Sequence, residues 1–124
     1  MKKTMLALTF ILSSNLAAAA DGNCPPPEVA DKTWAKCAAC HSLAEGNTSM
    51  LGPNLHGVVG RKAGSLEGFA YSPAMKASEI VFTAEKLDAF LAAPQEVIPQ
   101  NRMPFSGLKN PGDRVAVICK IKAS

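Results

Sequence analysis

Two cysteines and a histidine stand together in the stretch KCAACHS, residues 36–42. Cys37 and Cys40 are three positions apart, and His41 follows the second cysteine directly. Side chains at positions i and i+3 of a helix lie one above the other. This arrangement suits thioether bonds to two vinyl groups of one porphyrin, with the histidine projecting toward its metal. Because C-x-x-C-H is also the attachment pattern of c-type haem, the motif predicts one covalently attached haem c.

Two other chemistries use a C-x-x-C pair and remain open on the motif alone. A structural zinc site needs a second pair of Cys or His ligands, whereas Cys24, His56 and Cys119 lie far apart in the chain. A thioredoxin-like redox pair needs a strand just before the motif, but the prolines at 25–27 and a helical pattern precede it instead. Both alternatives are therefore weaker than haem.

A second axial ligand would favour electron transfer over chemistry at an open iron site. Met103 lies in VIPQNRMPFSG between Pro99 and Pro104, a rigid segment that could press a thioether onto iron, although a buried methionine can also simply fill the core. His56 is flanked by a glycine and is typical of a surface or hydrogen-bonded histidine. The downstream candidates are Met50, His56, Met75 and Met103.

Short helices are expected to position these residues. After the prolines at 25–27, the stretch 28–41 places Ala30, Trp34, Cys37 and His41 on one helical face. Ser72 and Thr83 are suitable caps for helices over residues 73–79 and 84–93, and Pro94 is expected to end the second of these.

Two further segments have weaker patterns. Residues 45–72 are rich in Gly, Pro, Asn and Ser, and so long a loop in a small domain suggests that it wraps something. Residues 110–113 could cap a last helix, but the following stretch RVAVICKIK alternates apolar residues as a strand would. Periodicity alone leaves this last element undecided.

The N-terminus has the pattern of a secretory signal peptide. A basic start, the apolar run MLALTFIL and the alanines at 18–20 follow one another. The apolar run is shorter than the roughly 20 residues that span a bilayer. We predict a signal peptide over residues 1–20, one domain over 21–124 and export to the periplasm, with an uncleaved anchor as the alternative.

Charge and cysteine content narrow the function further. The chain of 124 residues has 13 basic and 10 acidic residues, and loss of Lys2 and Lys3 leaves 11 against 10. So small a net charge argues against nucleic acid as a partner. All four cysteines lie beyond residue 20 and would meet an oxidising compartment.

Four segments closely resemble class I cytochromes c of the mitochondrial and short bacterial type. These are CAACH, LGPNLHGVVGRKAG, GFAYS and IPQNRMPFSG, and they follow in the family's order over most of residues 21–124. The resemblance implies an all-α cytochrome c fold, with a few helices wrapped around one covalent haem. It also implies that the N- and C-terminal helices cross, which favours a helix for the last segment.

The resemblance assigns the residues that hold the haem. Cys37 and Cys40 match the positions bonded to the vinyl groups, and His41 and Met103 match the two axial ligands. Pro53 matches the position whose carbonyl accepts a hydrogen bond from the histidine ring, which fixes the ring and its basicity.

Other positions match residues around the rest of the haem. Arg61 and Tyr71 match residues that neutralise or hydrogen-bond a buried propionate, Phe105 matches an aromatic at the haem edge, and His56 matches a histidine that is not a ligand. Basic residues at or near the exposed edge of the haem in the family correspond to Lys36, Lys62, Lys76, Arg102 and Lys109.

The chain departs from the family pattern beside the methionine. Phe82 stands where a Trp usually bonds a propionate, and Phe90 where a Tyr usually faces the sulfur. Met75 and Asn101 stand where an Asn and a Thr usually help to hold a buried water. The polar network is therefore expected to be thinner, and a weaker methionine–iron bond follows as an alternative.

The resemblance also bears on the remaining cysteines. Cys24 precedes the first helix and Cys119 lies in the last one, the two elements expected to cross. We predict a disulfide between them, with two free thiols as the alternative.

Together these features predict a soluble periplasmic one-electron carrier with His/Met ligation, and not an enzyme. We expect a monomer that meets redox partner proteins, such as membrane or periplasmic oxidoreductases, and uses no nucleic acid and no small-molecule substrate. The alternatives are a haem enzyme or sensor with a labile Met103, or a dedicated haem subunit of a periplasmic oxidoreductase.

Overall fold

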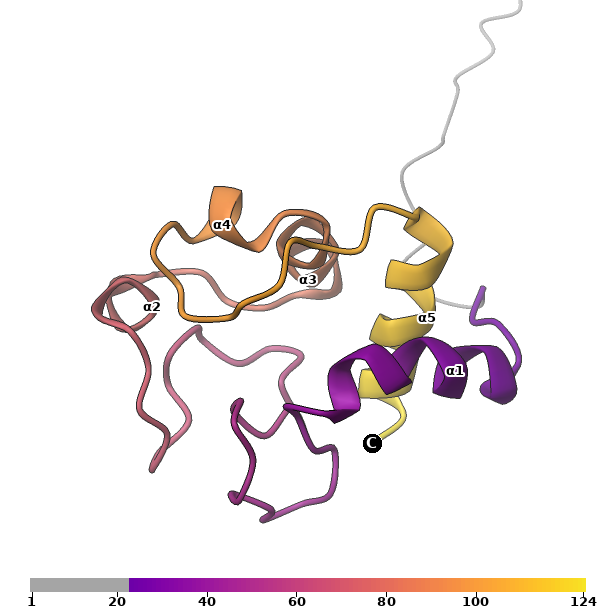
Figure 1. The fold of residues 1–124 in the computed structure, drawn as a ribbon, viewed down its shortest axis with the longest axis horizontal. Coiled ribbons are helices and arrows are strands. Elements are labelled where there is room, and N and C mark those ends of the chain that lie inside the picture. The colour runs from indigo at the N-terminus through magenta and orange to yellow at the C-terminus, as the bar shows by residue number, and fades with distance from the viewer. Residues whose placement is uncertain (1–22) are drawn as a thin grey trace, which may run out of the picture.

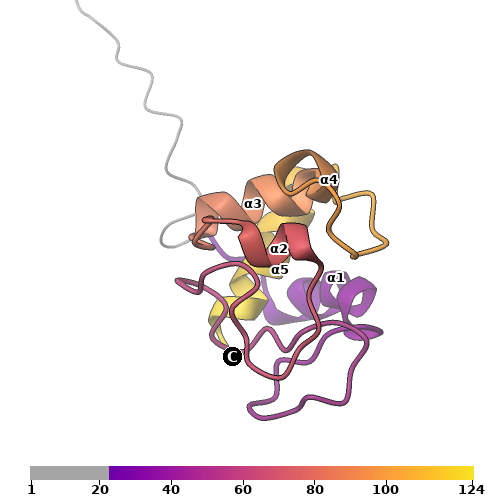
Figure 2. The same ribbon diagram turned by 90° about the vertical axis from the view of Figure 1, so that its left-hand side faces the viewer.

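The computed structural model describes residues 23–124, and within them the fold is helical with no strand (Figures 1 and 2). The predicted signal peptide over residues 1–20 lies outside this range. In the described part, no helix is long and apolar enough to cross a membrane. The helices are α1 (Pro27–Ala38), α2 (Pro73–Ala77), α3 (Ala84–Ala92), α4 (Pro94–Val97) and α5 (Pro111–Lys122).

Capping residues and prolines account for where the helices begin. The side chains of Ser72, Thr83 and Asn110 accept backbone N–H groups at the starts of α2, α3 and α5, which satisfies donors that a helix start leaves free. Pro94 ends α3, as expected, but it also begins the short helix α4, which the sequence did not predict. Proline suits the first position of a helix because its missing N–H has no partner there.

The last segment, whose periodicity was ambiguous, is helix α5. Its buried residues are Ala116, Val117, Ile118 and Ile121. Val115 and Cys119, which belong to the same alternating set as Val117 and Ile121, are only partly buried, as expected for a helix and not for a strand with one buried face. Helix α5 crosses α1, the pairing that the resemblance implied (Figure 1). The predicted all-α fold is confirmed.

The apolar core joins α3 and α5 to the irregular segments. Phe82 and Phe90 pack edge to face with ring centroids 5.3 Å apart, a favourable arrangement for two aromatic rings. Leu87 of α3 and Val117 of α5 belong to the same buried cluster. Charged groups tie the same helices together at the surface, because Arg114 of α5 contacts Asp88 of α3 at 2.8 Å.

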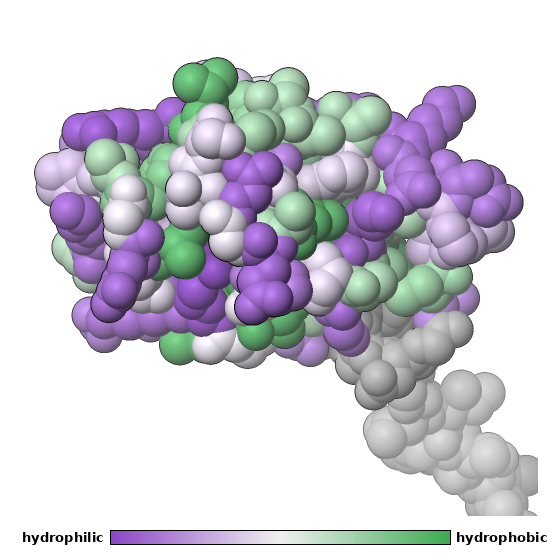
Figure 3. Space-filling view, turned by 90° about the horizontal axis from the view of Figure 1, so that it is seen from below, coloured by the Kyte–Doolittle hydropathy of each residue, from purple (hydrophilic) through white to green (hydrophobic). Residues whose placement is uncertain are grey.

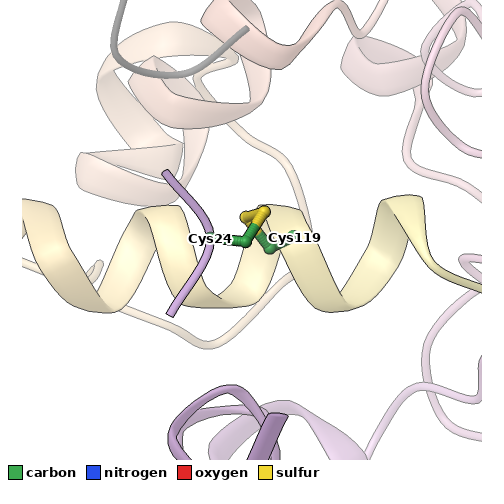
Figure 4. The surroundings of a disulfide bond; sticks show 2 residues. All are labelled: Cys24 and Cys119. Carbon is green, nitrogen blue, oxygen red and sulfur yellow. A yellow bond between two sulfur atoms is a disulfide. The ribbon is translucent and has the colours of Figure 1, made fainter. Parts of the chain in front are cut away.

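An ion pair joins helices α1 and α5, and a disulfide joins α5 to the segment just before α1. Lys36, in the last turn of α1, pairs with Asp113 in the first turn of α5 at 3.1 Å. The structure contains a disulfide between Cys24, just before α1, and Cys119 within α5, with Cα atoms 5.8 Å apart (Figure 4). The bridge closes a loop of 95 residue steps.

Removing this bridge is expected to lower stability without changing the fold. In the double variant Cys24→Ser/Cys119→Ser, the unfolded chain regains the freedom of a long loop, which costs the folded state about 2–5 kcal/mol. Denaturant titration of the haem-loaded protein would measure the loss. Unmodified protein in reductant is the matched control and should show the same decrease, and an unchanged midpoint in both would contradict the expectation.

Candidate functional site

A cavity of about 520 Å³ lies between the end of α1, the irregular segments, α3 and α5. Apolar side chains from distant parts of the chain make most of its wall, among them Trp34, Leu55, Phe82, Leu87, Phe90, Val117 and Ile121. In Figures 1 and 2, α3 and α4 lie at one end of the molecule and the loop after α1 at the other. The cavity thus receives side chains from both ends.

The cavity is lined by all three functional residues of the C-x-x-C-H motif, namely Cys37, Cys40 and His41. Cys37 belongs to the last turn of α1, but the helix ends at Ala38, so Cys40 and His41 lie beyond it. The prediction that helix extends to His41 was therefore wrong by one turn. The backbone N–H groups of Cys40 and His41 both donate to the carbonyl of Cys37, at 3.0 and 2.9 Å, and this tight turn keeps the motif compact.

The ring of His41 is oriented by a single strong hydrogen bond. Its Nδ1 lies 2.7 Å from the carbonyl oxygen of Pro53, as predicted for this pair. A carbonyl can only accept, so Nδ1 carries the proton and Nε2 keeps its lone pair. Burial lowers the pKa of His41, and the bond to Pro53 acts in the opposite direction. The side chain is therefore held as a neutral imidazole, the form that binds metal.

Gly52 allows the chain to approach this ring closely. A Cβ atom at position 52 would lie 2.5 Å from Cε1 and 2.7 Å from Nδ1 of His41, and 2.9 Å from the carbonyl oxygen of Cys40. The N–H of Gly52 donates to that same oxygen at 2.7 Å. The segment before Pro53 thus packs its backbone against the imidazole.

Neither cysteine of the motif takes part in a disulfide, and both are partly buried. Burial raises the pKa of the Cys37 thiol, while the charge of Lys36 acts to lower it and Cys40 acts to raise it. Before haem is attached, burial thus favours the neutral thiol of Cys37, which packs against the apolar core.

Two of the four candidates for the second axial ligand line the cavity. Met103 and Met75 line it, whereas Met50 and His56 are not among its lining residues. Met103 comes from the connection between α4 and α5, and Met75 from α2. The backbone N–H of His56 donates to Oδ1 of Asn54 at 2.7 Å, and its carbonyl oxygen accepts from Arg61 at 3.3 Å. That His56 is not a ligand stays a prediction.

Arg61, Tyr71 and Phe105 also line the cavity. The Arg61 guanidinium donates to the carbonyl oxygen of Asn54 at 2.7 Å and of His56 at 3.3 Å. Burial raises the pKa of the Tyr71 phenol, against the lowering effect of the nearby Arg61 charge. Arg61 and Tyr71 therefore bring a positive charge and a phenol to the wall of the cavity. Such a pair suits the binding of an acidic group.

Asn54 is a structural residue that sequence reasoning missed. Its side-chain amide donates to the carbonyls of Ala44 and Asn47, at 2.7 and 2.8 Å, and its Oδ1 accepts from the N–H of His56. This buried amide organises the loop that carries Gly52 and Pro53. An asparagine in a loop rich in glycine was the only signal, and such residues are common in turns.

The residues present fit a covalent haem. Two thiols and an imidazole with a free Nε2 come from one short turn, a thioether comes from another segment, and the walls are mostly apolar. Within residues 23–124, no group of three or more His, Cys, Asp and Glu could hold a metal ion on its own.

Comparison with known proteins agrees with this chemistry. No protein-family model matches the chain. It is 43% identical to cytochrome c2 of Rhodoblastus acidophilus over 71% of the chain and 82% of that protein. It is 45% identical to cytochrome c2 iso-2 of Magnetospirillum fulvum over 76% and 97%, and 38% identical to cytochrome c2 of Rhodomicrobium vannielii over 94% and 90%.

Substituting Gly52 tests the packing against the histidine ring. In Gly52→Ala the new methyl overlaps His41, and we expect a loss of about 1–3 kcal/mol of unfolding free energy, measured by denaturant titration together with the haem absorption spectrum. Gly112→Ala in α5 is the control, because its Cβ would meet only Asn110 Oδ1 at 3.2 Å and alanine favours helix. Equal stability of the two variants would contradict this picture.

Proposed function

The chain belongs to the class I cytochromes c, and from this premise we propose that it is a periplasmic one-electron carrier with His41 and Met103 as axial ligands. Members of this family carry a covalently attached c-type haem and transfer electrons without changing a substrate. The haem supplies the redox chemistry, because its iron cycles between Fe(III) and Fe(II). The chain binds the haem, orients its ligands and excludes water.

One observation carries the proposal for the ligands. Cys37, Cys40 and His41 line the same cavity as Met103, although some sixty residues of chain separate them. In this assignment the two cysteines hold the haem as thioethers. The imidazole of His41 offers Nε2 because Nδ1 is bonded to Pro53 at 2.7 Å, which fixes the ring. Met103 offers its sulfur from the connection between α4 and α5.

The remaining walls support electron transfer rather than substrate turnover. Phe82 and Phe90 line the cavity with aromatic rings that carry no polar group. The Trp and Tyr that are usual at these positions in the family would offer an indole N–H and a hydroxyl. Dry, apolar surroundings limit the rearrangement of water when iron changes charge, and they disfavour the additional charge of the ferric state. Arg61 and Tyr71 are placed to receive the acidic groups of the porphyrin.

Export to the periplasm is the part of the proposal that rests on sequence. The pattern of residues 1–20 is that of a signal peptide. A disulfide between Cys24 and Cys119 is stable in an oxidising compartment and rare in the cytosol of mesophiles. Both features support a mature domain over residues 21–124.

Several basic side chains at the expected docking edge are already engaged. Lys36 and Lys62 form ion pairs with Asp113 and Glu79, at 3.1 and 3.0 Å. Lys109 donates to two backbone carbonyl oxygens through its Nζ. These partners reduce the positive potential that the edge offers to an acidic surface.

The side chains of Arg102 and Lys76 make no ion pair or hydrogen bond within residues 23–124, and both residues are exposed. Arg102 also lines the cavity. On the face drawn in Figure 3, hydrophilic and hydrophobic residues are interspersed. We therefore propose weak, transient docking of redox partners, in which a few unpaired charges steer the encounter and mixed contacts complete it.

Absorption spectra of the purified protein test the ligand assignment. We expect the far-red methionine–ferric iron charge-transfer band, and no change of the ferrous spectrum when CO is added. Met103→Leu should abolish the band and admit CO, whereas the matched variant Met75→Leu, which alters the other cavity methionine, should keep both properties. Leucine nearly preserves methionine volume. If Met75→Leu alone removes the band, Met75 is the ligand and the assignment is wrong.

The charge at the docking edge can be tested with a small anionic oxidant. We expect Arg102→Gln to slow reoxidation of the ferrous protein by ferricyanide several-fold at low ionic strength, with the rates converging as salt screens the charge. Lys120→Gln is the control, because Lys120 pairs with Asp31 at the α1–α5 crossing and does not line the cavity. An equal effect of both variants would show that net charge, and not this edge, governs the encounter.

A further inference from the structure

We propose that Asn101, together with Gln95, positions Met103 as an iron ligand by fastening its loop to α4. The inference rests on the proposed ligation by Met103 and adds the device that keeps the thioether in place. Asn101 is buried, with 6% of its surface exposed, and it lies two residues before Met103. Its side chain is a positioning group, and the iron ligand is the sulfur of Met103.

The side-chain amide of Asn101 can donate two hydrogen bonds and accept two, and it makes three of these four. Its Nδ2 donates to the carbonyl oxygens of Pro94 at 2.9 Å and Ile98 at 2.8 Å. Its Oδ1 accepts the backbone N–H of Met103 at 3.0 Å. The same side chain thus binds the first residue of α4, the residue directly after α4, and the ligand residue itself. In a buried place, each of these groups would be costly to leave unpaired.

Gln95 completes this arrangement, which we call the amide clamp (Gln95 and Asn101). Its Nε2 donates to the carbonyl oxygen of Asn101 at 2.9 Å, and its Oε1 accepts the N–H of Gln100 at 3.1 Å. Gln100 has a φ of +64°, the only positive value at a residue other than glycine in the described chain. A side chain disfavours this conformation, so the bond from Gln95 helps to hold the turn that leads to Asn101.

The other end of the Met103 loop is fastened to α3. The N–H of Leu108 donates to the carbonyl oxygen of Leu91 at 2.7 Å. A Cβ atom at Gly107 would lie 2.1 Å from the carbonyl oxygen of Ala92, and its φ is +112°. The backbone is therefore held by hydrogen bonds on both sides of Met103, and along the chain the amide clamp is closer to Met103 than the bond at Leu108.

This placement explains how the thioether can be held without polar support of its sulfur. Phe90 and Met75 line the same cavity as Met103, and neither side chain carries a hydroxyl or amide. A ligand on a freely moving loop would lose conformational entropy each time it bound iron. The amide clamp removes that cost in advance, because the Met103 backbone is already fixed.

The test compares Asn101→Ala and Gln95→Ala with Asn110→Ala in the haem-loaded protein. Asn110 is an exposed cap of α5 whose Oδ1 accepts the N–H of Gly112 at 2.8 Å, so its loss costs stability without touching the Met103 loop. The readouts are the rate of CO binding to the ferrous protein, the hydrogen-exchange rate of the Met103 amide, and the denaturation midpoint.

We expect both rates to rise on the order of tenfold in Asn101→Ala, to rise less in Gln95→Ala, and to stay unchanged in Asn110→Ala. If Asn101→Ala does not fold, Gln95→Ala carries the test, because Gln95 is exposed. CO and exchange rates equal to those of Asn110→Ala would overturn the inference and leave the ligand assignment intact. Absence of the charge-transfer band in the unmodified protein would overturn both.

Discussion

The crossing of α1 and α5 is the contact on which the rest of the structure depends. Cys37 lies in the last turn of α1, and Val117 and Ile121 of α5 face the same cavity. The crossing therefore sets one wall of the site and places the motif that holds the haem beside it. Because the loop after α1 turns sharply at Cys37 and is tied to residues 52–55, a shift of α1 would displace the histidine as well.

The two proposed iron ligands are held in different ways, and the difference follows from their chemistry. An imidazole has a second nitrogen, so a bond to the carbonyl of Pro53 can orient the ring itself. A thioether has no donor and is a weak acceptor. The sulfur can instead be placed through the backbone that carries it. The amide of Asn101 does this at the N–H of Met103.

Sequence patterns predicted the parts of the molecule that local chemistry determines. The cysteine spacing, the caps at Ser72 and Thr83 and the Pro53–His41 pair are properties of short segments or of the family motif. Helix α4 has only four residues, too few to show a period. The bonds of Asn101 reach carbonyls three and seven residues away within an irregular segment, so no periodicity marks them. The alternating residues of α5 were ambiguous because only tertiary packing distinguishes a buried helix from a strand there.

The disulfide reinforces a crossing of α1 and α5 at which the buried side chains of α1 are small. The buried residues of α1 are Ala30 and Thr33, and Val29 is 46% exposed. Thr33 satisfies its hydroxyl within the helix by donating to the carbonyl of Val29 at 3.0 Å. Small side chains let two helices approach closely, but they remove little apolar surface from water. A bridge from Cys24 to Cys119 instead restricts the unfolded chain, so it stabilises the crossing without requiring larger side chains between the helices.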